Sequence, residues 1–171
     1  CAEPRDLRVT SPGASPVLLR NVLVGDVWIC SGQSNMEFSL YSANQGAAES
    51  RAATFPSLRL FTVLKQKAEV RQDRLSRTGW QACRPETAGP FSAVAYFFGR
   101  ELFRRLAIPI GLVHSAWGGT VAEAWTSDDA LRADPALRPL AEARLRQGPP
   151  EESARAAYER AMKALEARTR D

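Results

Sequence analysis

Ser34 is the side chain whose setting most directly suggests chemistry. It lies in the string VWICSGQSNMEF (residues 27–38), where an apolar run is followed at once by small and polar residues. A serine at a turn from a strand into a helix has its hydroxyl at the carboxyl edge of the sheet, and its backbone N–H points out of the helix. The hydroxyl can attack an ester carbonyl while the N–H binds the oxyanion that forms. The pattern indicates acyl transfer, whereas the simpler interpretation of a serine here is a helix N-cap.

A second segment in which an apolar run is followed by small residues is IGLVHSAWGGTVAEAW (residues 110–125). A predicted buried strand again ends in small residues, and Gly118 and Gly119 can bring backbone N–H groups close to a ligand at the sheet edge. A flexible turn is the simpler interpretation of this pair. Thr120 is expected to cap a short helix that contains Glu123 and Trp125.

A nucleophilic serine needs a base to take its proton, and histidine is the usual one. His114 is the single histidine of the chain. It falls inside the predicted strand, and no acidic residue nearby in sequence would orient it, so we expect a packed, hydrogen-bonded core imidazole. Three cysteines without CxxC spacing do not form a zinc motif. Of these, Cys30 lies in an apolar run and is expected to be a buried, inert thiol.

The elements that position these residues alternate in an α/β order. Residues 27–30 are a continuous apolar run, typical of a strand covered on both faces. Residues 92–106 have apolar side chains at helical spacing, with Ser92 as the expected N-cap and arginines in the last turn. Further strands are predicted at residues 7–10, 17–19, 58–64, 80–83 and 110–113.

The last part of the chain, residues 127–171, is predicted to be helical. Asp134 followed by Pro135 is typical of an N-cap and a first helical residue. Residues 151–170 have acid-to-base pairs four residues apart, which favour a second helix.

Two strings, VLVGDVWICSGQSNMEF (22–38) and FSAVAYFFGRELFRRLAIPIGLVHSAWGGTVAEAW (91–125), resemble the SGNH/GDSL hydrolase superfamily, within it the sialate O-acetylesterase family of carbohydrate esterases. GWQAC (79–83) resembles it more weakly. The resemblance implies a flavodoxin-like three-layer α/β/α sandwich that hydrolyses O-acetyl esters on sugars without metal or cofactor. Ser34 would be the nucleophile, and its amide with that of Gly118 or Gly119 would form the oxyanion hole. Gln33, Asn35, Glu123 and Trp125 are candidates for contacts to the sugar.

The resemblance also has gaps. A WYQGE-like string and a C-terminal Asp-x-x-His, which would supply an oxyanion donor and the base, do not occur in these 171 residues. We therefore expect residues 1–126 to be the N-terminal part of the catalytic domain, with residues 1–21 as a β-rich lead-in. Residues 127–171 would be a helical extension toward the remainder, and the isolated chain would have little activity. The alternative is a noncatalytic carbohydrate-binding or assembly module with the same fold.

Composition narrows the remaining classes of partner. The net charge is +4, and acids are interspersed with the basic residues, which argues against a nucleic-acid surface. No apolar run approaches the ~18 residues of a membrane span. Relatives of the resembled family are mostly secreted, periplasmic or lysosomal, so the resemblance favours an extracytoplasmic location.

Overall fold

The computed structural model describes residues 3–66, 72, 79–146 and 159–160. The chain divides into two compact units, Cys1–Thr120 and Val121–Asp171. Each unit is described separately below, beginning with the first.

The first unit is built on a four-stranded sheet in the order β3-β6-β4-β5. Strands β3 (Asp26–Gly32), β6 (Ile110–Ala116) and β4 (Phe55–Thr62) run parallel, and β5 (Gln81–Cys83) pairs antiparallel with β4. The central strand β6 therefore lies between β3 and β4, so the connection from β3 to β4 passes over it. The predicted α/β fold is confirmed.

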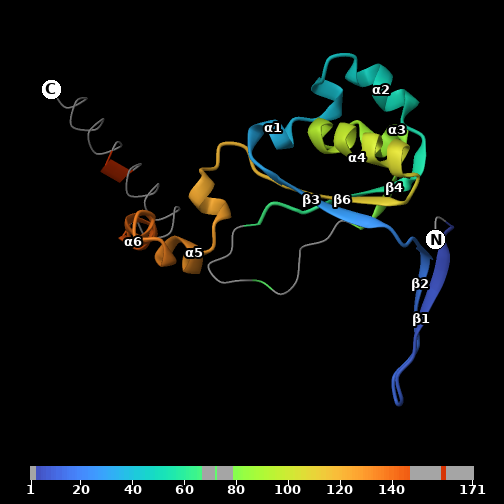
Figure 1. Ribbon diagram of the computed structural model, residues 1–171, viewed down its shortest axis with the longest axis horizontal. Helices are drawn as coiled ribbons and strands as arrows, with labels where there is room; N and C mark the ends of the chain where they lie inside the picture. The colour runs from blue at the N-terminus through green and yellow to red at the C-terminus, as the bar shows by residue number, and fades with distance from the viewer. Residues whose placement is uncertain (1–2, 67–71, 73–78, 147–158, 161–171) are drawn as a thin grey trace. The chain divides into compact units, whose positions relative to one another are not determined.

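Helices follow the strands on one side of the sheet (Figure 1). Between β3 and β4 lie α1 (Ser34–Glu37), the 3-10 turn η1 (Leu40–Ser42) and α2 (Gly46–Ala52). After β5 come α3 (Pro85–Ala88) and α4 (Ala93–Leu106). The described residues of the first unit thus provide the sheet and one helical layer of the expected sandwich.

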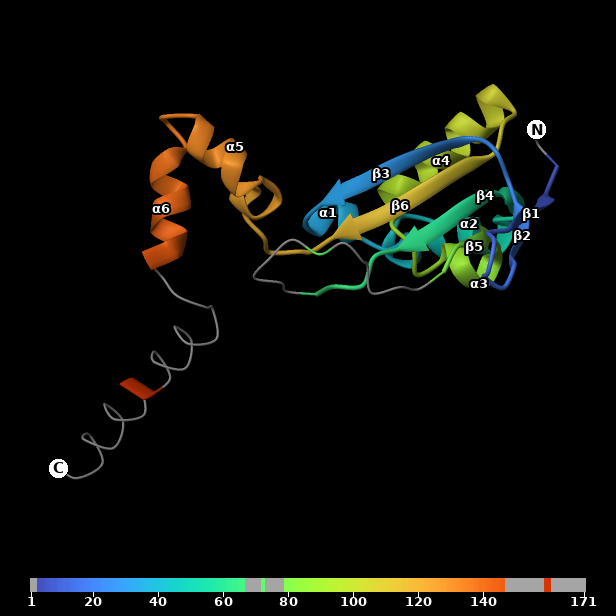
Figure 2. The same cartoon turned by 90° about the horizontal axis from the view of Figure 1, so that it is seen from below.

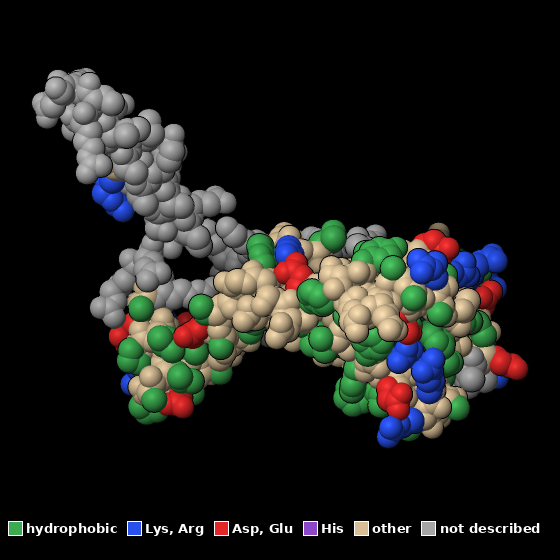
Figure 3. Space-filling view, turned by 90° about the horizontal axis from the view of Figure 1, so that it is seen from above, with side chains coloured by type: hydrophobic (Ala, Val, Ile, Leu, Met, Phe, Trp, Pro, Cys, Tyr) green, Lys and Arg blue, Asp and Glu red, His purple; other side chains and the backbone are tan. Residues whose placement is uncertain are grey.

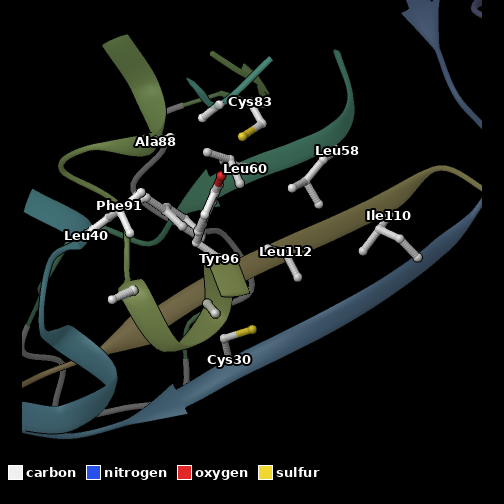
Figure 4. Packing of buried hydrophobic residues seen from close by; sticks show 13 residues of the cluster. Cys30, Leu40, Leu58, Leu60, Cys83, Ala88, Phe91, Tyr96, Ile110 and Leu112 are labelled. Carbon is white, nitrogen blue, oxygen red and sulfur yellow. The ribbon is translucent and has the colours of Figure 1, made fainter. Parts of the chain in front are cut away.

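Helix α4 is the main partner of the sheet. It begins where the sequence predicts, because the Ser92 side chain accepts a hydrogen bond from the Ala95 N–H. Its inner face packs on residues of β6 and β4 that are essentially unexposed (Figure 4). A methyl group on Gly99 would lie 2.5 Å from Leu112 Cδ1, so any larger residue here would force the buried Leu112 side chain to shift. The buried hydrophobic core between the helices and the sheet includes Cys30, Leu40, Leu58, Leu60, Cys83, Phe91, Tyr96, Ile110 and Leu112.

Strand β3 departs from the prediction that both of its faces are covered. Val27 is 62% exposed and Ile29 75%, because these side chains point to the face opposite α4, which no described helix of the first unit covers. Figure 2 shows that face, with β3, β6 and β4 in front of the helices. On the other face, Cys30 is buried as predicted, and burial raises the pKa of its thiol. The apolar run correctly predicts a strand but not its place at the edge.

A separate two-stranded hairpin precedes the sheet. It consists of β1 (Arg5–Val9) and β2 (Val17–Val22), paired antiparallel. Both strands were predicted, with shorter bounds for β2. Almost all of their side chains are exposed.

Charged side chains on the helical layer are mixed in sign. Figure 3 shows basic and acidic groups next to each other on the side that carries α2 and α4. Glu49 of α2 forms an ion pair with Arg100 of α4, and Glu101 pairs with Arg105 one turn further on.

No helix among the described residues has the length and hydropathy to cross a membrane.

The second unit contains η2 (Ala122–Trp125), α5 (Asp128–Ala133) and α6 (Arg138–Arg146). The cap predicted at Thr120 is wrong. The residue that precedes η2 is Val121, and the Thr120 hydroxyl donates instead to the Trp117 carbonyl at 2.7 Å. Asp134 follows α5 and its side chain accepts from the Ala136 N–H at 2.8 Å, as expected of an N-cap, but a single turn comes first and α6 begins only at Arg138. The helix predicted over residues 151–170 lies outside the described residues, apart from two helical residues at 159–160.

Candidate active site

Ser34 lies where the parallel strand β3 turns into α1. Gly32 has φ +149°, a value that favours glycine and allows the chain to turn sharply after the strand. Gln33 is the N-cap, and Ser34 is the first residue of the helix. The N-cap interpretation of Ser34 is therefore wrong. Its side chain is exposed at the carboxyl edge of the sheet, as acyl transfer requires.

The Ser34 hydroxyl is hydrogen-bonded to a neighbouring side chain, that of Gln33. It donates to Gln33 Oε1 at 3.1 Å, and the Ser34 N–H donates to the same oxygen at 3.3 Å. Both groups that an acyl substrate would use are thus held by one exposed amide side chain. Asn35, also exposed, follows on the same turn of α1.

The diglycine turn lies beside this serine. β3 and β6 are in parallel register up to the pair Gly32 and Ala116, and the Trp117 N–H donates to the Gly32 carbonyl at 3.0 Å. A methyl group on Gly118 would lie 3.6 Å from Ser34 Cα and 3.8 Å from its Cβ. The sequence-based expectation that the two segments meet at one sheet edge is confirmed.

The two glycines differ in their surroundings. The Gly118 N–H donates to Glu37 Oε2 at 2.6 Å, so this amide already has a strong acceptor. Gly119 is exposed with φ +79°, and a methyl group there would meet no atom within 4 Å. The positive φ makes glycine the favoured residue at position 119.

Glu37 and Lys65 are two residues of this site that the sequence motifs did not single out. Glu37 lies on α1 and pairs with Lys65, which follows β4. The ion pair with Lys65, and then the hydrogen bond from Gly118, lower the pKa of the Glu37 carboxyl. An acid three residues after the serine, within the same helical turn, was the available signal.

His114 is a core residue, as predicted. It is 8% exposed and lies against the Phe91 ring at 5.4 Å between ring centres. Its Nε2 donates to the Met36 carbonyl at 3.1 Å. Burial lowers its pKa, so the neutral imidazole is favoured. The side chain joins β6 to α1 and does not approach the Ser34 hydroxyl within hydrogen-bond distance.

Two further candidates for contacts to the sugar lie in the second unit. Glu123 and Trp125 both belong to η2, where Trp125 is 41% exposed and Glu123 half-buried. Within the described part of the chain, no group of three or more histidine, cysteine or acidic residues could hold a metal ion.

Comparisons with known proteins identify the family of this chain. The family model for carbohydrate esterases of the sialic acid-specific acetylesterase type matches residues 24–170. The chain belongs to this family. That match includes both the serine turn and the diglycine turn.

Individual members of the acetylesterase family agree with the assignment. The sialate O-acetylesterases of Homo sapiens and Mus musculus are each 40% identical, over 123 and 124 residues, which is 67% of this chain. The crystal structure of a carbohydrate acetylesterase from Xanthomonas citri matches with a TM-score of 0.71 and 43% identity, covering 75% of this chain and 30% of that one. The chain spans about a quarter of the length of the curated relatives, 24% and 23%.

Proposed function

We propose that the protein containing this chain is an esterase that removes O-acetyl groups from carbohydrates, with Ser34 as its nucleophile. The family assignment supports the reaction class and the substrate class. The observation that carries the choice of residue is the exposed hydroxyl at the end of β3, with Gly118 so close that a methyl group on it would touch Ser34.

The reaction proceeds in two steps on this serine. Ser34 Oγ forms a bond to the acetyl carbon as its proton passes to a base, and the negative charge gathers on the carbonyl oxygen. The Ser34 N–H and one N–H of the diglycine turn bind that oxyanion. The sugar oxygen leaves with a proton, and water then hydrolyses the acetyl-serine to acetate and free Ser34.

The base is proposed to lie outside these 171 residues. The single histidine donates its Nε2 to a backbone carbonyl within the core, so it is not positioned to accept the Ser34 proton. Removing one oxyanion donor alone costs about 100- to 1,000-fold in kcat. We therefore predict little or no ester hydrolysis by residues 1–171, and turnover of p-nitrophenyl acetate that Ser34→Ala abolishes would contradict this prediction.

Two exposed residues beside the nucleophile are proposed to contact the sugar. Gln33, the N-cap of α1, and Asn35, in its first turn, flank Ser34, and the Gln33 amide must rotate away from Ser34 when the ester binds. Glu123 and Trp125 belong to η2 of the second unit and stay sequence-based candidates for sugar binding, because an aromatic face packs well on a sugar ring.

Labelling with a fluorophosphonate tests the nucleophile. In the full-length protein we expect one modified residue, Ser34, and no labelling after Ser34→Ala. The matched control is Ser31→Ala, because Ser31 is an exposed serine on the neighbouring strand β3. Labelling that survives Ser34→Ala would refute the assignment.

A noncatalytic carbohydrate-binding module is the second candidate. The observation that favours it is that, among the described residues, Gln33 is the polar side chain bonded to the Ser34 hydroxyl, and an amide cannot act as its base. Sugar binding by the full-length protein that is unaffected by Ser34→Ala, together with no fluorophosphonate labelling, would support this alternative.

A further inference from the structure

Glu37 joins the helix that carries Ser34 to the diglycine turn. It lies one helical turn after the serine, and its Oε2 accepts the Gly118 N–H at 2.6 Å. The other carboxylate oxygen, Oε1, pairs with Lys65 Nζ. A single side chain therefore connects three segments that meet at the carboxyl edge of the sheet: α1, the residues after β4 and the residues after β6.

Lys65 reinforces this connection from the other side. Its Nζ lies 5.6 Å from the centre of the Trp117 ring, so the same ammonium group contacts the residue before Gly118 and the carboxylate bonded to Gly118. The side chains are partly shielded, with 34% of Glu37 and 43% of Lys65 exposed. A carboxylate that accepts one amide and one ammonium has its charge compensated locally.

The hydrogen bond also decides which glycine is available to a substrate. An amide already bonded to a carboxylate at 2.6 Å is a poor donor for a transient oxyanion, because the acceptor would have to be displaced first. Gly119 follows directly, is exposed, and has open space beside its Cα. A bare carboxylate near the oxyanion would oppose it electrostatically, and the pairing with Lys65 compensates the Glu37 charge.

We propose that Glu37 is a positioning residue that fixes the diglycine turn through the Gly118 amide, leaving Gly119 to supply the second oxyanion donor. The proposal rests on the esterase function proposed above and concerns the same site. It assigns Lys65 the task of holding the Glu37 carboxylate in place. Neither residue touches the reacting atoms.

An NMR measurement on the full chain tests the contact without relying on activity. In a glycine-labelled sample, the Gly118 amide proton should resonate downfield and move upfield as the Glu37 carboxylate is protonated. The groups that act on this carboxylate are Lys65 and, from β6, His114, and the Lys65 pair keeps the transition below the ordinary range of a glutamate pKa. Glu37→Gln should abolish the downfield shift, whereas Glu101→Gln, which removes an exposed helical carboxylate paired with Arg105, should leave it unchanged.

Kinetics on the full-length esterase test the consequence. Glu37→Gln should lower kcat about 10- to 100-fold with KM within about twofold, because a shifted turn misplaces the oxyanion donor but not the sugar contacts. Glu101→Gln should match the wild type. A Gly118 amide that responds equally to both substitutions, or an unchanged kcat in Glu37→Gln, would overturn the proposal. A wild-type protein without esterase activity would instead refute the function, and the NMR result would still decide the Glu37 contact.

Discussion

Acidification from pH 7.5 to 5.5 should destabilise the first unit through His114. Burial lowers the pKa of this imidazole below its ordinary value of 6.5, so the unfolded chain takes up a proton at a pH where the folded chain does not. The contribution of neutral His114 to the free energy of unfolding is therefore fully present above pH 6.5 and is lost as the pH falls toward the pKa of His114 in the folded chain. Because the chain has one histidine, this window belongs to a single residue.

The size of this loss of stability has an upper limit, because His114 takes up at most one proton. The free energy of unfolding can fall by at most about 1.4 kcal/mol per pH unit. Between pH 6.5 and 5.5 that corresponds to a decrease in Tm of up to ~3–6 °C for a chain of this length. Glu37 and Glu49, whose pKa values are also lowered, titrate below their ordinary value of 4.5 and do not contribute to this window.

Thermal unfolding followed by circular dichroism at half-unit pH steps measures this slope. His114→Gln is the matched control, because the Gln amide keeps a donor for the Met36 carbonyl and does not titrate. We expect Tm to fall between pH 6.5 and 5.5 in the wild type and to stay constant over this range in His114→Gln. Equal slopes in the two proteins, or a wild type whose Tm does not change between pH 6.5 and 5.5, would refute the account of His114 as a buried neutral imidazole.

Three substitutions test the scaffold of the site, each by urea unfolding. Leu112→Ala should cost about 2–5 kcal/mol, because Leu112 is fully buried in β6 against Gly99; a cost below about 1 kcal/mol would contradict this packing. Ser92→Ala should cost ~1 kcal/mol through loss of the cap on the Ala95 N–H, whereas an unchanged midpoint would mean that the cap contributes nothing. Gly119→Ala should also cost about 1 kcal/mol from its positive φ alone, since the methyl group meets no atom; a larger loss would reveal a contact at that position.

The turn that carries Ser34 shows what residues close together in the sequence can predict. An apolar run, a glycine and a short polar string predict a strand, a sharp turn and a helix, because each depends on residues close together in the chain. The parallel arrangement then places the ends of β3 and β6 at one edge, which accounts for the meeting of Ser34 with the diglycine turn. The N-cap at Ser92 was predictable for the same local reason.

Other features depend on partners that no local pattern specifies. An apolar run of four residues looks the same in a strand covered on one face and in a strand covered on both, so the exposure of Val27 and Ile29 followed only from where the helices pack. The bond between Glu37 and the Gly118 N–H joins residues 81 positions apart. Residue types and short spacings established the strands, the turn and the candidate nucleophile, whereas packing between distant segments decided which amide is occupied and which histidine atoms are available, because those contacts exist only once the sheet has assembled.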